Sequence, residues 1–476
     1  MSSPPPKAAV HFHSLGCPKN LLDTEVMLGS LAVHGYAIAE RLDDADVAVV
    51  NTCSFIESAR EESIQAILDV AGRKGREGLR ALIVTGCLPQ RYGAELAREL
   101  PEVDAFVGTG SFQEIALILD DTLAGRSRGI YVEAGRTHLY DDHSPRVLVG
   151  QGHTAYVKIA EGCDRTCSFC AIPAIRGTFQ SRTLRSVIAE AEQLASIGVR
   201  EINLVAQDST AWGKDLPARG AGGDAPPTDA SRGRPRLETM LRALDEVAGL
   251  DWIRLLYVYP TALSDELIDV LASSKRVLPY VDVPLQHASD RILALMKRGS
   301  TEARHRHLVE RLRKGIPNVT LRTTYMVGFP GEGEEDFARL CDFVRETRFD
   351  RVGVFRYSDE EGTAAHALPG KVPQAVARKR YRRLLEIQRE IMLEKLESRV
   401  GEESQVLVDA VIGGGLAQAR LPSQAPEIDG VVFLKGEVRP GDLVAARITG
   451  VRDVDLEAEL SGDVVERSTS RARPRS

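Results

Sequence analysis

The sequence lacks the features of membrane-spanning and exported proteins. No apolar run approaches the ~20 residues that a membrane-spanning helix needs, and the short polar start does not resemble a secretory signal peptide. An excess of positive charge is also missing, because the formal net charge is −7, and this argues against a general affinity for nucleic acid. The seven cysteines are too few, and odd in number, for a disulfide framework. We therefore expect a cytoplasmic protein without membrane association, whose reduced cysteines bind metal or act in catalysis.

The order of patterns along the 476 residues predicts an α/β protein of three domains. In residues 1–123, short apolar strands alternate with helical patterns, which predicts an open parallel α/β sheet. A polar, glycine-containing linker is expected over residues 124–152. Six further strand–helix units in residues 153–400 predict a partial or full TIM-like (β/α) barrel. Short strands separated by Gly and Pro predict a small antiparallel β-barrel over residues 401–463, followed by a basic tail over residues 464–476.

The expected strands are short apolar runs. They cover residues 10–15, 47–50 and 81–85 in the first domain, and 155–159, 201–206, 252–258, 280–283, 319–327 and 351–355 in the second. Residues 213–236 are rich in Gly, Pro, Asp and Ala without periodicity, which predicts a flexible insertion. Cys341 shares a predicted helix face with Phe337 and Leu340, which indicates core packing rather than a ligand.

Three cysteines lie in one loop directly after the first expected barrel strand. Cys163, Cys167 and Cys170 are spaced by four and three residues, so their thiolates can hold one corner of a cubane iron–sulfur cluster. Three ligands for four irons leave one iron open to a substrate. The alternative is a zinc site without its fourth ligand, or three unrelated thiols, but structural zinc requires a closed shell of four ligands.

A second cysteine triad is spread over the first domain. Cys17, Cys53 and Cys87 lie 36 and 34 residues apart, and each follows an expected strand within three residues. Because the ends of parallel strands meet at one edge of a sheet, where ligands bind, we expect the three thiols to converge. Gly16 and Gly86 would allow the backbone to approach a cluster closely. The alternative is that all three are ordinary buried cysteines.

The loop from Cys163 to Cys170 resembles the radical S-adenosylmethionine superfamily. This resemblance implies that S-adenosylmethionine chelates the open iron and is cleaved to a 5′-deoxyadenosyl radical. Two triads followed by a small barrel resemble the methylthiotransferase family over nearly the whole chain. That family implies two 4Fe–4S clusters, a terminal TRAM barrel, and an electron donor such as flavodoxin or ferredoxin. The cluster on the first triad would carry the sulfur, one S-adenosylmethionine would supply the methyl group, and another would supply the radical.

The family has a branch that modifies an adenosine of transfer RNA and a branch that modifies an aspartate of the twelfth small-subunit ribosomal protein. In the RNA branch we expect Gln-Met-Asn after the first cysteine, whereas this chain has Pro-Lys-Asn. Five strings resemble the protein branch: residues 15–20 (LGCPKN), 206–210 (AQDST), 257–260 (YVYP), 284–288 (PLQHA) and 322–332 (RTTYMVGFPGE). The GFPGE part of the last string alone would suit either branch. The resemblance implies insertion of a methylthio group at the aspartate β-carbon.

The charge of the predicted C-terminal barrel gives a separate physical criterion for choosing between the two branches. Residues 402–463 contain 12 acidic and 5 basic residues, whereas a module that binds RNA should be basic. An acidic barrel suits a basic partner, either the ribosomal protein or the assembled small subunit, although a merely solvated acidic surface is the alternative. The basic run over residues 378–383 is interpreted as a solvated helix face, with RNA contact as a secondary role.

Candidate contacts to S-adenosylmethionine follow barrel strands, where such sites form. They are Gln207 and Asp208 after the second strand and Glu332 after the fifth; each could equally be a cap or turn residue. Two rival functions remain open: a transfer-RNA adenosine methylthiotransferase, and a two-cluster electron-transfer or redox-sensing protein. A carrier would normally use protein ligands for every iron, which two triads do not provide.

Overall fold

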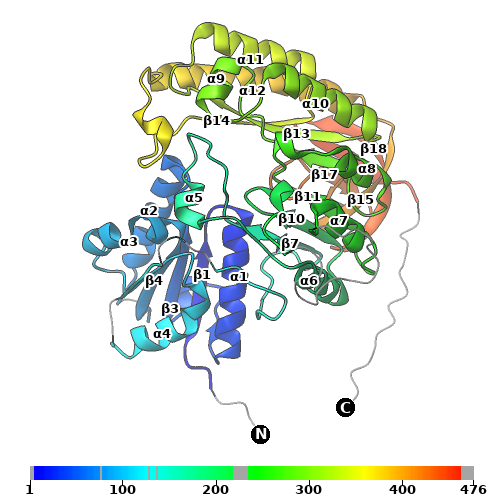
Figure 1. The fold of residues 1–476 in the computed structure, drawn as a ribbon. Coiled ribbons are helices and arrows are strands. Elements are labelled where there is room, and N and C mark those ends of the chain that lie inside the picture. The colour runs from blue at the N-terminus through cyan, green and yellow to red at the C-terminus, as the bar shows by residue number, and fades with distance from the viewer. Residues whose placement is uncertain are drawn as a thin grey trace.

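The computed structural model describes residues 5–75, 78–126, 129–133, 135, 138–217 and 234–462. An N-terminal α/β part, blue to cyan in Figure 1, lies beside a central barrel, green to yellow. None of the helices in these ranges has both the length and the apolar character that a membrane span requires. The expected tail over residues 464–476, and most of the expected insertion over residues 213–236, lie outside the described residues.

The N-terminal part is one parallel sheet with the strand order β2-β1-β3-β4-β5-β6. Its central strands are buried at every position because helices cover both faces, and this explains their continuous apolar runs. The strands are β1 (Ala9–Ser14), β2 (Ala37–Ile38), β3 (Val47–Thr52), β4 (Ala81–Gly86), β5 (Ala105–Val107) and β6 (Gly129–Tyr131). The helices are α1 (Pro18–Val33), α2 (Glu57–Ala71), α3 (Cys87–Glu99) and α4 (Ile115–Leu123).

The segment that we expected to be a linker, residues 124–152, is in part a continuation of this sheet. Its strand β6 pairs in parallel with β5, and three residues are too short a run to show strand periodicity in a sequence. The same segment also carries Arg146, which pairs with Glu25 and Glu190, both at 2.6 Å. These ion pairs attach the segment to both neighbouring parts of the protein.

The central part is a partial barrel of six parallel strands. Two three-stranded groups, β11-β10-β7 and β12-β13-β14, are joined where the Val258 amide donates to the Asp282 carbonyl at 2.9 Å. The strands are β7 (Thr154–Lys158), β10 (Glu201–Val205), β11 (Trp252–Leu255), β12 (Tyr280–Asp282), β13 (Thr320–Val327) and β14 (Arg351–Arg356). All six expected strands are therefore present, and Cys341 is packed in the core of this part.

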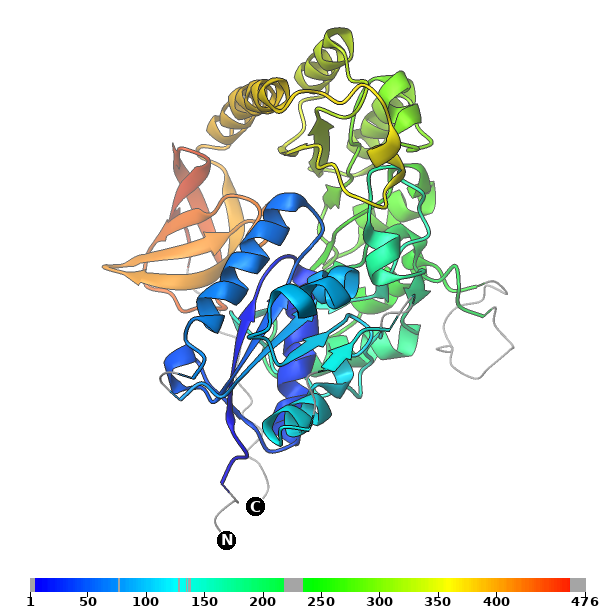
Figure 2. The same ribbon diagram turned by 90° about the vertical axis from the view of Figure 1, so that its left-hand side faces the viewer.

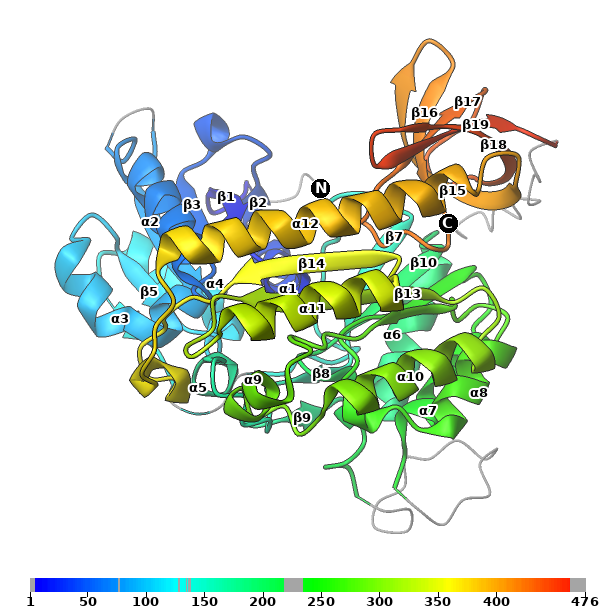
Figure 3. The ribbon, with the colours of Figure 1, turned by 90° about the horizontal axis from the view of Figure 1, so that it is seen from above.

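Helices cover the outside of the barrel strands (Figure 3). They are α6 (Leu184–Ser196), α7 (Leu237–Asp245), α8 (Asp265–Ser273), α9 (Asp290–Leu295), α10 (Glu302–Gly315), α11 (Glu334–Thr347) and α12 (Gln374–Glu397). Before α6 the chain forms the short hairpin β8 (Ala160–Glu161) and β9 (Gln180–Ser181), with α5 (Ile172–Arg176) between its strands. Helix α5 packs against α3 of the N-terminal part.

The C-terminal part is a closed barrel at the far end of α12 (Figures 2 and 3). Its strands are β15 (Glu403–Gly413), β16 (Leu416–Arg420), β17 (Val432–Lys435), β18 (Leu443–Arg452) and β19 (Asp455–Leu460). The predicted barrel is confirmed, with one difference: β17 and β19 pair in parallel, while all other neighbours are antiparallel. Buried residues alternate along β18, as expected for a strand with one face in a core.

Buried ion pairs attach this barrel to the central part. Arg420, 2% exposed, contacts Glu201 of β10 and Asp409 of β15, both at 2.7 Å. Glu201 also pairs with Arg254 of β11 at 3.0 Å, and Asp409 faces His153 at 3.1 Å. Removing one member of such a network leaves the others buried and uncompensated, which is strongly destabilising.

We expect Arg420→Ala to lower the free energy of unfolding by about 3–5 kcal/mol, because two buried carboxylates, Glu201 and Asp409, lose the guanidinium that they share. Urea denaturation of the purified protein measures the change. Arg447→Ala is the matched control: Arg447 pairs with Glu403 at 2.6 Å, but both side chains are more than half exposed. The control should change stability by less than about 1 kcal/mol. Equal effects of the two substitutions would contradict the role of the buried network.

Candidate functional site

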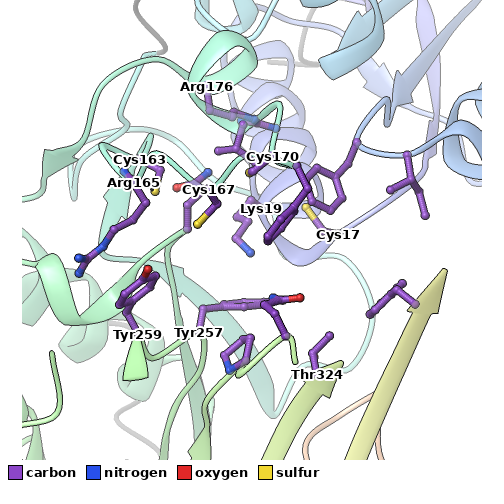
Figure 4. A pocket seen from close by; sticks show the side chains of 18 of the residues that line it. Cys17, Lys19, Cys163, Arg165, Cys167, Cys170, Arg176, Tyr257, Tyr259 and Thr324 are labelled. Atoms are coloured by element: carbon purple, nitrogen blue, oxygen red, sulfur yellow. Dashed lines mark hydrogen bonds between the residues drawn. The ribbon is translucent and has the colours of Figure 1, made fainter. Parts of the chain in front are cut away.

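One cavity of 480 Å³ lies between the N-terminal part and the central barrel. Figure 4 shows side chains from both parts that line it. All six cysteines of the two triads are among the lining residues, and none forms a disulfide. The structure therefore brings together two triads that lie in different parts of the sequence.

The first triad converges because its three strands are neighbours. Cys17 lies between β1 and α1, directly before the helix, Cys53 follows β3, and Cys87 begins α3 after β4. The order β1-β3-β4 places the three strand ends side by side at one edge. Gly16 is required there, because its φ is +90° and a Cβ on it would lie 2.7 Å from the Cβ of Cys53.

The second triad lies in the loop between β8 and α5, and the barrel holds this loop in place. The Cys163 amide donates to the Gly177 carbonyl at 3.1 Å, and the Ser168 amide donates to Met296 at 3.1 Å. Arg298 donates a hydrogen bond to the Sγ of Cys167 at 3.3 Å. Each contact fixes a cysteine of this loop or the neighbour of one.

The ring of Tyr259 lies between two arginines, one from this loop and one from the barrel. The guanidinium of Arg165 lies 3.8 Å from the ring centroid of Tyr259, and that of Arg298 lies 4.3 Å from it. Arg165 also pairs with Asp208 at 2.7 Å, and the Tyr259 hydroxyl donates to the Arg298 carbonyl at 3.0 Å. The ring therefore ties the cysteine loop to two barrel strand ends.

The chemistry of the lining fits iron–sulfur clusters. Burial raises the pKa of Cys53 and Cys163, and it raises the pKa of Cys87 and of Cys170 to about 12. These thiols are therefore protonated without a metal, and binding iron as thiolates would release protons. Among the described lining residues there is no carboxylate, whereas four are cationic: Lys19, Arg165, Arg176 and Arg298. Such a lining favours the binding of anionic groups, and iron–sulfur clusters with thiolate ligands are anionic.

Four buried charges connect the two triads. Asp23 of α1 accepts from Lys158 of β7 at 2.6 Å and from Arg176 of α5 at 2.7 Å. Glu161 of β8 pairs with the same Lys158 and Arg176, at 2.5 Å and 3.3 Å. Arg176 also donates to the Sγ of Cys87 at 3.4 Å. One guanidinium thus contacts the first triad and the segment that leads into the second.

The cations control the charge of Glu161. Burial alone disfavours its carboxylate, but Lys158 and Arg176 outweigh this effect and lower the pKa of Glu161 to about 2. Gln207 donates a hydrogen bond to the same carboxylate and lines the cavity. Glu161 is therefore ionised at neutral pH, and it orients a predicted cofactor contact.

The other two predicted contacts lie differently. Asp208 is 2% exposed and is bonded to Arg165, so it acts on the cavity through that arginine. Glu332 is not among the lining residues: its carboxylate accepts from the amides of Gly328 and Phe329 and pairs with Arg380 at 3.0 Å. The prediction that Glu332 contacts S-adenosylmethionine directly does not fit this geometry, because one of its oxygens is bound by amides of the loop after β13 and the other by Arg380 of α12.

Sequence reasoning missed the basic and aromatic residues of the cavity. Lys19 and Tyr257 belong to the strings that carry the family resemblance, but only the fold places the ammonium 3.3 Å from the ring centroid. Arg176 and Arg298 had no distinguishing signal, because isolated arginines are common. Their partners come from other elements, so the sequence order does not reveal them.

Three regions of the chain match known families. Residues 9–108 match the uncharacterized protein family UPF0004, residues 157–344 match the radical SAM superfamily, and residues 400–460 match the TRAM domain. The matches follow the same order as the N-terminal sheet, the central barrel and the C-terminal barrel.

Relatives of nearly the same length are similar throughout. The ribosomal protein uS12 methylthiotransferase RimO of Geobacter sulfurreducens is 48% identical over 457 residues, which cover 95% of this chain and 99% of that protein. The protein of that name from Myxococcus xanthus is 44% identical over 476 residues, which cover 99% of this chain and 95% of that protein. Among solved structures, the radical S-adenosylmethionine methyltransferase TsrM from Kitasatospora setae matches 73% of this chain and 72% of its own. Its TM-score is 0.50 at 16% identity, a likeness of fold alone.

The low pKa of Glu161 predicts an acid-dependent loss of stability. A carboxyl whose pKa is about 2 in the folded protein, against 4.5 in the unfolded chain, stabilises the fold above pH 4.5. That contribution is lost as the pH falls from 4.5 toward 2. We expect iron-free wild-type protein to lose unfolding free energy between pH 5 and about pH 3.5 more steeply than Glu161→Gln. Urea denaturation across this range measures both slopes, and equal slopes would contradict the prediction.

Proposed function

This chain belongs to the RimO family of ribosomal protein uS12 methylthiotransferases, and from this we propose that it inserts a methylthio group at the β-carbon of an aspartate of uS12. It is a radical S-adenosylmethionine enzyme, and its cofactors are S-adenosylmethionine and 4Fe–4S clusters. The observation that most supports the proposed reaction is the cavity on which two cysteine triads open. A reaction that removes hydrogen from carbon and then adds sulfur needs both groups within reach of one carbon.

In this proposal each triad holds one cluster. Cys163, Cys167 and Cys170 would hold the cluster that binds S-adenosylmethionine, and Cys17, Cys53 and Cys87 the cluster that carries sulfur. When bound, these groups would supply the hydrogen-abstracting radical and the methylthio unit. The chain's own residues orient the cofactors and exclude water. Gln207 is the candidate contact to S-adenosylmethionine that lines the cavity, while Asp208 and Glu332 position the loops around it.

Apolar side chains from both parts of the protein line the cavity and its entrance. Phe55 follows β3, Phe169 lies in the second cysteine loop, and Phe355 lies on β14. Phe55 and Phe355 are 40% and 48% exposed, so they form part of the entrance. Dry surroundings protect a carbon radical from solvent-borne hydrogen donors before it meets sulfur.

The partners follow from the same proposal. The acidic C-terminal barrel would attract a basic ribosomal protein or the assembled small subunit in the cytoplasm, and a flavodoxin or ferredoxin would supply electrons. RNA contact is secondary. Within the basic run 378–383, Arg380 is 5% exposed and bound to Glu332, so it is not part of a solvated face. Arg378, Lys379 and Arg382 remain exposed on α12.

Iron content tests the ligand assignment. We expect the anaerobically reconstituted protein to bind about eight irons, because each triad holds one cubane. Replacing Cys163, Cys167 and Cys170 with Ala should leave about four and abolish cleavage of S-adenosylmethionine. Replacing Cys17, Cys53 and Cys87 should also leave about four, keep the cleavage and abolish methylthio transfer. The matched control is Cys341→Ala, since this buried cysteine lies in the core. Full iron content in either triple variant would contradict the assignment.

The substrate assignment is tested by offering competing substrates under matched conditions. Mass spectrometry after incubation with uS12, with intact small subunits and with transfer RNA should detect the modification on uS12 aspartate alone. Transfer to the basic protein should slow as salt rises, because salt screens opposite charges over ~10 Å at 0.1 M. Methylthio-adenosine in the RNA, with uS12 unmodified, would overturn the proposed substrate and leave the radical chemistry intact.

A further inference from the structure

The cavity contains one cation that differs from the others. Three cations have polar partners within the protein: Arg165 pairs with Asp208, Arg176 with Asp23, and Arg298 donates to Cys167. Lys19 has neither a hydrogen bond nor an ion pair with any residue in the described part of the chain. Of the four cations that line the cavity, Lys19 alone has no polar partner among the described residues of the protein.

Lys19 is nevertheless largely removed from solvent. It lies in the first turn of α1, two residues after Cys17, and is 9% exposed. Its Nζ lies 3.3 Å from the ring centroid of Tyr257, and Figure 4 shows it between Cys17 and the second triad, above that ring. The ammonium faces the cavity, and the face of a ring offsets only part of the hydration that it has lost. An anion from a bound molecule would complete the compensation.

The backbone at Tyr257 shows that the ring is held in place. This tyrosine has a φ of +60°, a conformation that residues with a bulky side chain rarely adopt. Its amide donates to the Asp282 carboxylate at 3.2 Å, and its carbonyl accepts from the Ser209 amide at 3.0 Å. Strained backbone of this kind persists where surrounding contacts fix it, and it is concentrated at functional sites.

We propose that Lys19 binds the side-chain carboxylate of the substrate aspartate, with Tyr257 as the residue that positions its ammonium. This inference rests on the proposed function, because it concerns the aspartate that is modified there. The carboxylate is bonded directly to the β-carbon, so holding it fixes the reacting carbon in the space between the two triads. The amino-terminal end of α1 adds partial positive charge at the same place.

Binding measurements on the reconstituted holoenzyme test this role. The probe is a fluorescently labelled peptide of uS12 that spans the target aspartate, measured by anisotropy with S-adenosylmethionine present. We expect Lys19→Met to weaken its binding by about tenfold or more, whereas Lys19→Arg retains most of the affinity. Changing the peptide aspartate to asparagine should weaken binding to the wild type similarly and add nothing in Lys19→Met. Lys314→Met, at an exposed lysine near the end of α10, is the control that should not change the affinity.

Two further measurements on Lys19→Met separate this role from others. Iron content and the dissociation constant for S-adenosylmethionine should equal those of the wild type. Loss of about half the iron would assign Lys19 to the neighbouring cluster, and weaker S-adenosylmethionine binding would assign it to the cofactor carboxylate; either result overturns the inference. Equal affinity of the wild type for the aspartate and asparagine peptides would also overturn the inference. If the wild type modifies uS12 but Lys19→Met binds the peptide as tightly as the wild type, only this inference is wrong. If the wild type leaves uS12 unmodified, the proposed function falls with it.

Discussion

The buried charge network at the boundary of the N-terminal sheet and the central barrel determines the geometry of the site. Asp23 comes from the first part, and Lys158, Glu161 and Arg176 come from the second. A buried charge without a partner is strongly destabilising, so the two parts cannot dock in a geometry that separates these groups. Apolar packing alone tolerates rearrangement, because hydrophobic contacts have no fixed direction. The network therefore fixes the position at which two cysteine triads from different parts of the chain share one cavity.

A second interdomain contact holds the entrance of the cavity. Glu360, in the loop after β14, pairs with Arg60 at 3.0 Å and with Arg91 at 2.7 Å, both from the N-terminal part. Its side chain is 3% exposed. Because Phe355 precedes this loop and Phe55 follows β3, the same contact sets the spacing of two aromatic rings at the entrance. The cavity is thus held at its base by one ion network and at its entrance by another.

The local parts of the site were predictable from the sequence, and its assembly was not. A cysteine after each of three parallel strands is a local pattern, and parallel topology makes these ends converge. The docking of the two parts depends on Arg176 and Asp23, which are 153 positions apart in the chain. No periodicity links such residues. Likewise, Glu332 follows a barrel strand as a cofactor contact would, but Arg380 and two backbone amides bind it, and only the folded loop reveals this.

The dimensions of the cavity limit the form in which a protein substrate can react. A volume of 480 Å³ is that of a small-molecule site, and under the proposed function the cofactor must occupy part of it. A folded domain cannot enter such a space, so the reacting side chain has to be carried in on a projecting loop. Under the proposed function, selection of the partner would then fall on surfaces outside the cavity, such as the acidic C-terminal barrel, while selection of the side chain would fall on the cavity lining. A lining with four cations and, among its described residues, no carboxylate favours an acidic side chain over a neutral one.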